Sequence, residues 1–397
     1  MVLNFWSKYK KWINLFILLV ILVYASILRF EYFVYFKDLP LEADAQGFFN
    51  LAHQPTGFYG AGIREPVIIF LAKIGISIFG DQAWVVRLWS LVFSLLLVLA
   101  VYFIGQAIFN EVIGLGAALV TGITPILIQS STRGLRTEAY AVFLLVFIYF
   151  LFVHKKYPLL VRLIITGVTG GILALLRLEA ILTCVLLLIY FFLTEGKQVL
   201  KEKLYLGGKV ILAVFIMTLV VAPFLINNYR AYGDSFYSQN AHATFWRNQE
   251  FASQAGFPSI EEVNKNGYAG VPVTTFAYIF KMHTAGEIIL RYIQGYVFSV
   301  TKYLLFILAE QLWLSFLGLI GLVLLLFSPY RYLSVTFLVA LLPVAFILPL
   351  NTIGHRGVDI RFILHIYPLF ILAMLYPLLL AYKSYASKQK NKKTGSV

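Results

Sequence analysis

Two carboxylates lie close together in the segment Leu39-Pro40-Leu41-Glu42-Ala43-Asp44. Glu42 and Asp44 are two residues apart, between a proline and the aromatic pair Phe48-Phe49. A carboxylate held near lipid can have its pKa raised towards neutrality, and it can then accept a proton from an attacking hydroxyl. The same spacing is typical of a solvated acidic turn, so the segment alone leaves both interpretations open.

Arginines with acidic neighbours recur at three further places: Arg64-Glu65-Pro66, the stretch from Arg133 through Arg136 to Glu138, and Arg177-Leu178-Glu179. A guanidinium group suits a phosphate because it donates two parallel hydrogen bonds. The last pair interrupts an apolar run, and a charge inside a bilayer is expensive, so we expect it at a helix break facing protein or water. The alternatives are ion pairs within loops, contacts with lipid headgroups and, for Glu138, a place in the first turn of a helix.

A long segment from 227 to 302 contains many aromatic residues among Asn, Gln, Ser and Gly, including Tyr237 and Trp246. Aromatic faces with nearby amides suit the binding of a sugar or a peptide. His355, on the same expected side of the membrane, is a further candidate for contacting a sugar or an acceptor. A belt of Tyr and Trp at the membrane interface is the alternative interpretation.

The elements that must position these residues follow from composition. The 397 residues are 60% hydrophobic and only 13% charged, whereas soluble domains have about 25% charged residues. The chain is therefore expected to be an all-α polytopic membrane protein, because its apolar runs are continuous and lack the alternation of barrel strands. The single cysteine, Cys184, excludes a disulfide framework and a thiolate metal cluster.

Apolar runs of about 20 residues predict about ten crossings, within a range of roughly nine to twelve. Pro66 to Phe79 is too short to cross and is expected to lie along the interface, and 286–299 predicts another surface helix. The expected crossings are residues 12–30, 84–109, 113–130, 138–153, 159–176, 178–194, 209–226, 303–327, 332–350 and 361–382.

Charge predicts the orientation. The first apolar stretch follows a basic segment and has no small-residue cleavage site, so we expect a retained helix rather than a signal peptide. With both termini cytoplasmic, most of the net charge of +14 lies inside, as the positive-inside rule requires. All but three of the 18 acidic residues then lie on the outer side, where the loops 31–83 and 227–302 are long.

These assignments predict one transmembrane domain, residues 1–382, followed by a basic, disordered cytoplasmic tail, 383–397. The tail has no interleaved aromatic residues, so it does not predict a nucleic-acid site. The expected location is the plasma (inner) membrane, and membrane lipids are expected partners.

The order of these features resembles the GT-C glycosyltransferases that use polyprenyl-phosphate sugars, specifically the branch of protein O-mannosyltransferases and aminoarabinose transferases. The resemblance covers roughly Leu39 to Arg177 and again Asp359 to Ala373. The matching stretches are Glu42-Ala43-Asp44, Arg64-Glu65-Pro66, Gly80 to Ser90 with Arg87-Leu88, Thr124-Pro125 to Glu138, Leu175-Leu176-Arg177 and Arg361-Phe362-Ile363-Leu364-His365-Ile366-Tyr367-Pro368.

The resemblance implies a GT-C-like bundle with an active site on the outer face. Asp44 matches the first-loop carboxylate of the family and would be the general base or would orient the acceptor, with Glu42 as the substitute. Glu138 and Glu65 would help to shape the site. The expected ligands of the donor phosphate are Arg64, Arg136, Arg177 and Arg361, and the expected contacts of the acceptor or sugar are Tyr237, Trp246 and His355.

The implied reaction is an inverting transfer from a polyprenyl-phosphate-linked sugar to a glycan, lipid or protein acceptor. The sequence leaves open the sugar, the acceptor, the polyprenyl length and the use of a divalent cation, because no compact His/Asp motif decides the last. A lipid or sugar transporter, or flippase, is the alternative function, and a noncatalytic scaffold is a third. A transporter predicts a path through the membrane, whereas the acids here gather on one side.

Overall fold

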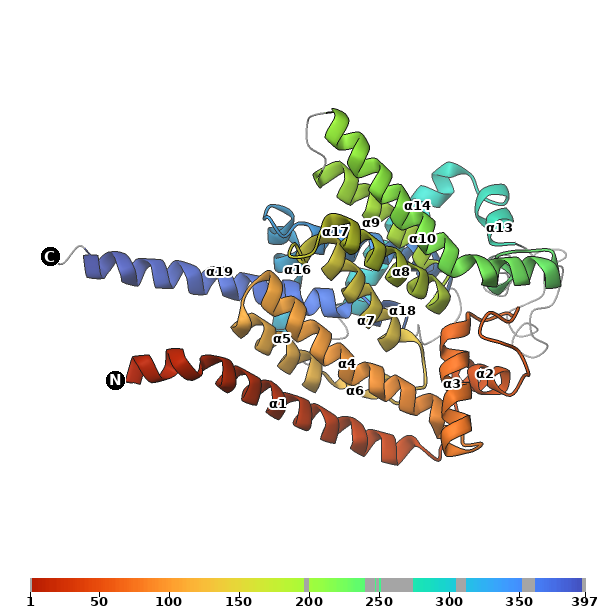
Figure 1. Ribbon diagram of the computed structural model, residues 1–397, viewed down its shortest axis with the longest axis horizontal. Helices are drawn as coiled ribbons and strands as arrows, with labels where there is room; N and C mark the ends of the chain where they lie inside the picture. The colour runs from red at the N-terminus through yellow and green to blue at the C-terminus, as the bar shows by residue number, and fades with distance from the viewer. Residues whose placement is uncertain are drawn as a thin grey trace.

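The computed structural model describes residues 2–195, 200–239, 247, 250, 274–304, 312–351 and 361–394, and every regular element in these ranges is a helix. Figure 1 shows the helices gathered into one bundle. Within the described ranges, 5 helices are long and apolar enough to cross a membrane: Tyr9–Phe36, Trp84–Ile108, Leu159–Leu176, Lys201–Tyr232 and Tyr367–Ser387. The sequence-based prediction of an all-α membrane protein is confirmed.

The five long helices are α1 (Val2–Phe36), α4 (Trp84–Ile108), α8 (Leu159–Leu176), α10 (Leu200–Tyr232) and α19 (Tyr367–Thr394). Shorter apolar helices accompany them: α3 (Pro66–Phe79), α5 (Glu111–Ile123), α7 (Thr137–Ile148) with the π-helical η1 (Tyr149–Val153), α9 (Ala180–Glu195), α16 (Leu312–Leu326) and α17 (Tyr332–Asn351). The remaining helices are α2 (Ala43–Ala52), α6 (Pro125–Ser130), α13 (Thr275–Lys281), α14 (Ala285–Phe298), η2 (Ser299–Leu304) and α18 (Arg361–Leu364).

The expected crossings correspond to helices at nearly the same residues, but several are shorter or divided. The predicted span 113–130 divides into α5 and α6 because Pro125 begins a new helix and has no N–H to continue the old one. The predicted span 361–382 divides into α18 and α19. The surface helix expected at 286–299 is α14, whose capping box joins Thr284 and Glu287.

The end of α19 differs from the expectation of a disordered tail after residue 382. The helix continues to Thr394. The physical reason is composition, because Ala, Lys and Gln between 381 and 394 are good helix formers.

The core consists of one large apolar cluster between the helices, with smaller clusters where α1 meets α4 and α5 and where α8 meets α10. The helix α4 packs against α5, α8 against α10, α16 against α19, and α14 against α17. Where α14 packs against α17, a Cβ on Gly295 would lie 1.6 Å from the carbonyl oxygen of Ala345. Only glycine therefore allows the two backbones to approach this closely. Side chains on the outward face of α1, such as Phe16 and Phe30, stay exposed, which suits a helix facing lipid.

A fully buried arginine joins α1 to the end of α5. Nη2 of Arg29 donates to the carbonyl of Thr121 at 3.1 Å, and Nη1 donates to that of Gly122 at 2.7 Å. The carbonyl of Thr121 has no helical partner because residue 125 is a proline. Nε of Arg29 also donates to Ser94 at 2.7 Å. Arg29 therefore supplies hydrogen bonds that α5 cannot make for itself.

The two ends of the bundle differ. Figure 1 shows both chain termini at one end, on the left of the view, and α2 and α3 at the opposite end, on the right. The breaks α6–α7 and α8–α9 contain the charged residues of the sequence motifs. At the first of these breaks Gly134 has φ +71°, and a Cβ there would lie 3.2 Å from that of Ala45 and 3.1 Å from Cγ1 of Val86. This glycine thus lets the loop pass close to both α2 and α4.

Candidate functional site

Asp44 lies between two arginines from distant parts of the chain. It stands in the first turn of α2, and its Oδ1 accepts a hydrogen bond from Nη2 of Arg64 at 2.7 Å. Its Oδ2 accepts a hydrogen bond from Nη1 of Arg361, the first residue of α18. The Asp44 side chain is 23% exposed, so solvent or a ligand can still reach it. The structure thus brings together three of the residues predicted to form the site.

A small cavity adjoins this cluster. It has a volume of about 40 Å³ and is lined by Asp44, Phe48, Leu135, Arg136, Thr137, Arg177, Arg361 and Phe362. Three guanidinium groups therefore line the same cavity as the Asp44 carboxylate. This volume has room for water but not for a sugar.

A second network is centred on Glu65 and includes Arg136, which also lines the cavity. Glu65 stands at the N-cap position of α3, where its side chain makes no capping hydrogen bond, and it is only 3% exposed. Its carboxylate accepts hydrogen bonds from Arg136, from the backbone N–H of Leu178 at 3.1 Å and from Nε2 of Gln239 at 3.2 Å. Nη1 of Arg136 also donates to the carbonyl of Leu176 at 2.9 Å. Glu65 and Arg136 therefore join α3 to the break between α8 and α9.

Arg177 and Glu179 form the helix break that the sequence indicated. The chain is extended at Arg177, and Nε of Arg177 donates to Oε1 of Glu179 at 2.6 Å. The guanidinium also lies over the ring of Tyr140, 5.7 Å from its centroid. Gln239 bridges the two networks because its Nε2 lies 3.1 Å from Oε2 of Glu179. Sequence reasoning did not select Gln239, whose type and neighbours carry no distinctive signal.

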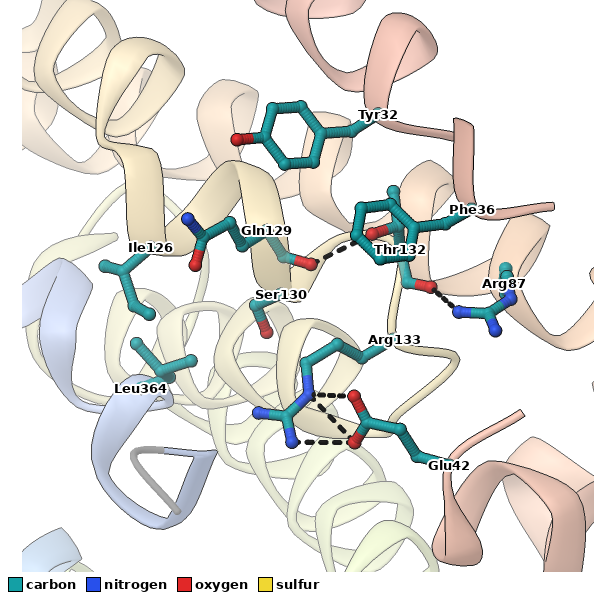
Figure 2. A pocket seen from close by; sticks show the side chains of 10 residues that line it. All are labelled: Tyr32, Phe36, Glu42, Arg87, Ile126, Gln129, Ser130, Thr132, Arg133 and Leu364. Carbon is teal, nitrogen blue, oxygen red and sulfur yellow. Dashed lines mark hydrogen bonds and ion pairs between the residues drawn. The ribbon is translucent and has the colours of Figure 1, made fainter. Parts of the chain in front are cut away.

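Glu42, at the start of α2, pairs with Arg133 in the connection between α6 and α7. Figure 2 shows the guanidinium fork facing the carboxylate, with Nε and Nη2 donating at 2.6 to 3.0 Å. Arg87 joins the same two connections, because it donates to the carbonyl of Thr132 at 2.6 Å and to that of Pro40 at 2.8 Å. Arg133 and Arg87 stood in the sequence motifs but were not selected as site residues, because spacing does not tell which arginines face a carboxylate.

Glu138 has a different environment from Asp44. It is 3% exposed, and its carboxylate accepts hydrogen bonds from Ser130 and, at 3.1 Å, from Ser90. It does not line the cavity of Asp44. In this arrangement Glu138 joins α7 to α4 and α6, so its predicted part in shaping the site would be exerted through those helices.

The predicted contacts for an acceptor lie partly within the described residues. Tyr237 stacks on Tyr232, with ring centroids 3.8 Å apart and planes 12° from parallel. Trp246 and His355 lie outside the described residues. In the same long segment, 227–302, Glu250 receives hydrogen bonds from Tyr278 and Arg291, and Nε2 of His283 lies 2.9 Å from its Oε1. This cluster was not anticipated from the sequence.

Among the residues that the structure describes, no group of three or more His, Cys, Asp or Glu side chains could hold a metal ion. The carboxylates of the site are instead paired with arginines.

Residues 63–221, which are less than half of the chain, match the family described as dolichyl-phosphate-mannose-protein mannosyltransferase. No curated protein sequence matches the chain.

Several solved structures are similar to this chain, and those with a TM-score above 0.5 share its fold. The oligosaccharyltransferase AglB from Archaeoglobus fulgidus, in complex with an inhibitory peptide and a dolichol-phosphate, has 13% identity and a TM-score of 0.58; the match covers 98% of this chain and 52% of that one. The enzyme from the same organism in complex with Zn and sulfate has 15% identity and a TM-score of 0.54, covering 92% and 49%. ArnT from Cupriavidus metallidurans has 14% identity and a TM-score of 0.49, covering 98% and 62%.

The chain thus spans about half the length of the archaeal oligosaccharyltransferase. The match over 63–221 includes the charged breaks at Arg136 and Arg177, and the shared fold extends over nearly the whole chain. Together they confirm that this membrane protein resembles the GT-C glycosyltransferases.

Proposed function

We propose that this protein is a membrane glycosyltransferase that moves a sugar from a polyprenyl-phosphate donor to an acceptor at the outer face of the membrane. The proposal rests on the Asp44 carboxylate, which lies between Arg64 and Arg361 beside a cavity that Arg136 also lines. The transfer needs a proton acceptor next to cations that stabilise a departing phosphate. The family matched over residues 63–221 has the same class of reaction in its description.

In the proposed reaction, a hydroxyl oxygen of the acceptor forms a bond to the anomeric carbon. The bond between that carbon and the phosphate oxygen breaks, and its electron pair leaves with the polyprenyl phosphate. The proton of the hydroxyl passes to Asp44, or to Glu42 as the substitute base. A single displacement of this kind inverts the anomeric carbon and needs one base rather than two flanking carboxylates.

The ion pairs of Asp44 support a coupling between donor binding and the base. A phosphate and a carboxylate accept the same hydrogen bonds from guanidinium groups, so the donor would compete with Asp44 for Arg64 and Arg361. Binding would then release a carboxylate oxygen to accept the proton. The cavity volume of about 40 Å³ agrees with this coupling, because the ion pairs must open before a phosphate-linked sugar can enter.

The proposed setting is the plasma (inner) membrane, with both termini cytoplasmic. The excess of basic residues on the side of the termini supports this orientation. The acceptor is a glycan, lipid or protein. A divalent cation is an open part of the proposal, so transfer is to be measured both with and without a chelator.

The experiment is transfer by the purified protein, reconstituted in lipid, with a panel of polyprenyl-phosphate sugars as donors. Mass spectrometry follows donor consumption and the glycosylated product. Asp44→Asn should lower the rate by about 10²–10⁴-fold, which is the usual contribution of a general base. The matched control is Asp38→Asn, whose carboxylate stands in the same loop and is 79% exposed. Unchanged transfer by Asp44→Asn would remove Asp44 from the mechanism.

A further inference from the structure

A second, larger cavity lies next to the cavity of Asp44. Its volume is about 390 Å³, within the range of roughly 300–1,000 Å³ that is typical of ligand sites. The same three segments, 42–44, 133–136 and 361–364, contribute residues to both cavities. Figure 2 shows Tyr32, Gln129 and Arg133 around the larger one.

The charged groups of the larger cavity make most of their hydrogen bonds within the protein, although Nε of Arg87 has no partner in the described part of the chain. Glu42 and Arg133 form an ion pair with three hydrogen bonds. Arg87 donates to the carbonyls of Leu39, Pro40 and Thr132, at 3.0, 2.8 and 2.6 Å. The larger cavity is thus lined by two arginines and one carboxylate, against three arginines and one carboxylate in the smaller cavity, so it favours a phosphate less.

Neutral polar groups complete the lining. The hydroxyl of Tyr32 and the side-chain amide of Gln129 face the cavity, and neither has a hydrogen-bond partner within the described part of the chain. The ring of Phe36 and the side chain of Leu364 add apolar surface. Hydroxyls, an amide, a carboxylate–guanidinium edge and apolar faces together suit a sugar ring, which presents hydroxyls at its edge and C–H groups on its faces.

The two cavities thus differ in the chemistry that they offer. The smaller one is lined by Arg136, Arg177 and Arg361 with one carboxylate, whereas the larger one is lined by two arginines, one carboxylate and several neutral polar side chains. We propose that the larger cavity binds a neutral sugar ring, the saccharide part of the acceptor. The inference rests on the proposed function, in which the donor phosphate takes the smaller cavity. Glu42 and Asp44 stand at the start of the same helix and each lines one of the two cavities, so a ring in the larger cavity lies beside the segment that carries the proposed base.

The test uses the full chain in phosphatidylcholine nanodiscs and two probes, methyl mannopyranoside and methyl glucopyranoside, each carrying a photoreactive diazirine. Illumination should place adducts on Tyr32 or on residues 126–133, as mapped by mass spectrometry. An excess of the unmodified methyl glycoside should remove the adducts, and inorganic phosphate should not. Tyr32→Phe should weaken labelling by about fivefold, the effect of one lost hydrogen bond.

Matched controls separate a local effect from misfolding. Tyr35→Phe removes a hydroxyl from the same helix, at a side chain that is 73% exposed and does not line the cavity. Labelling of this variant should equal that of the unmodified protein. Gln129→Ala should weaken labelling as Tyr32→Phe does, and Gln106→Ala, whose side chain lies on α4 outside the cavity, should not.

Three results would overturn the inference. Adducts elsewhere on the chain would place the sugar at another site, and displacement by inorganic phosphate would identify an anion site. Displacement by polyprenyl-phosphate mannose in the Asp44→Asn variant would show that the cavity holds the sugar of the donor. Labelling needs no turnover, so a failure here is distinguishable from a failure of glycosyl transfer in the test of Asp44.

Discussion

Arg361 donates a hydrogen bond to Asp44 although the two residues stand 317 positions apart. Arg361 begins α18, near the end of the chain, and Asp44 lies in the first turn of α2. Since Asp44 also pairs with Arg64, its carboxylate joins the first loop to the last helices. The candidate site is therefore complete only after the late helices have packed against the first loop.

Arg361 should be required for transfer as a ligand of the donor phosphate. Arg361→Ala is expected to lower the rate by about 10²–10³-fold, the usual effect of losing one donor that stabilises developing charge. Arg361→Lys keeps the charge but not the planar fork of the guanidinium group, so its rate should lie between those of the wild type and of Arg361→Ala. Arg331→Ala, at the connection between α16 and α17, is the control, and wild-type rates for Arg361→Ala would rule out the assigned role.

Glu65 should be required for stability. Its removal leaves the guanidinium of Arg136 and the N–H of Leu178 without their acceptor in a region where Glu65 is 3% exposed. Glu65→Ala should reduce the free energy of unfolding by about 3–5 kcal/mol, as for other buried pairs that lose one partner. Thermal unfolding in detergent measures the loss of stability. Glu31→Ala, at an exposed position of α1, serves for comparison, and an equal effect of both changes would argue against the Glu65 network.

Arg29 should stabilise the contact between α1 and α5 without taking part in transfer. Arg29→Met keeps an apolar stem but leaves the carbonyls of Thr121 and Gly122 unpaired, at a cost of about 1–3 kcal/mol for each buried group. The apparent unfolding temperature should fall, and the activity of the fraction that stays folded should be retained. Lys37→Met changes a cation near the end of the same helix, at a side chain that is 43% exposed, and should have little effect. A variant as stable as the wild type would contradict this account of Arg29.

The Glu250 cluster should make the attachment of α14 dependent on pH. Burial by itself raises the pKa of Glu250, but hydrogen bonds from Tyr278 and His283 and the charge of Arg291 lower it below the ordinary value of 4.5. A depressed carboxyl pKa stabilises the fold above the ordinary value, and this stabilisation is lost as the pH falls through the lowered pKa. Hydrogen exchange in α14, corrected for intrinsic rates, should therefore speed up on acidification below 4.5.

Glu250→Gln should remove most of this pH dependence, since the amide does not titrate. Glu195→Gln, at a carboxylate whose side chain is 45% exposed, should leave it intact. If exchange in α14 of the unmodified protein did not respond to pH, the cluster would have no such part in holding the helix.

Gly134 should tolerate no side chain. Its φ of +71° disfavours an L-residue by about 1–2 kcal/mol, and a Cβ would press against Val86 and Ala45. Gly134→Ala should therefore destabilise the protein and, by displacing the loop that carries Arg133 and Arg136, lower transfer as well. Gly57→Ala, where a Cβ meets nothing within 4 Å, should do neither. A fully active and stable Gly134→Ala variant would contradict the proposed close approach.

The helical membrane fold could be predicted from the sequence because it depends on local properties. Continuous apolar runs must satisfy their backbone hydrogen bonds internally, so each run predicts a helix wherever its neighbours lie. The helix break at Arg177 followed in the same way from the cost of a charge in an apolar run. The shortening of helices at Pro125 was also readable in principle, since proline cannot continue a helix.

The pairing of the charged side chains could not be predicted in this way. Spacing places Arg64, Arg133, Arg136, Arg177 and Arg361 near helix ends, but it does not say that Arg64 and Arg361 meet Asp44 while Arg133 meets Glu42. Nor does it distinguish Glu138, held between two serines, from Asp44 beside a cavity. Local sequence sets which residues stand at the ends of helices. Which of those ends come together is set by long-range packing, because an ion pair depends on the distance between two segments and local sequence does not determine that distance.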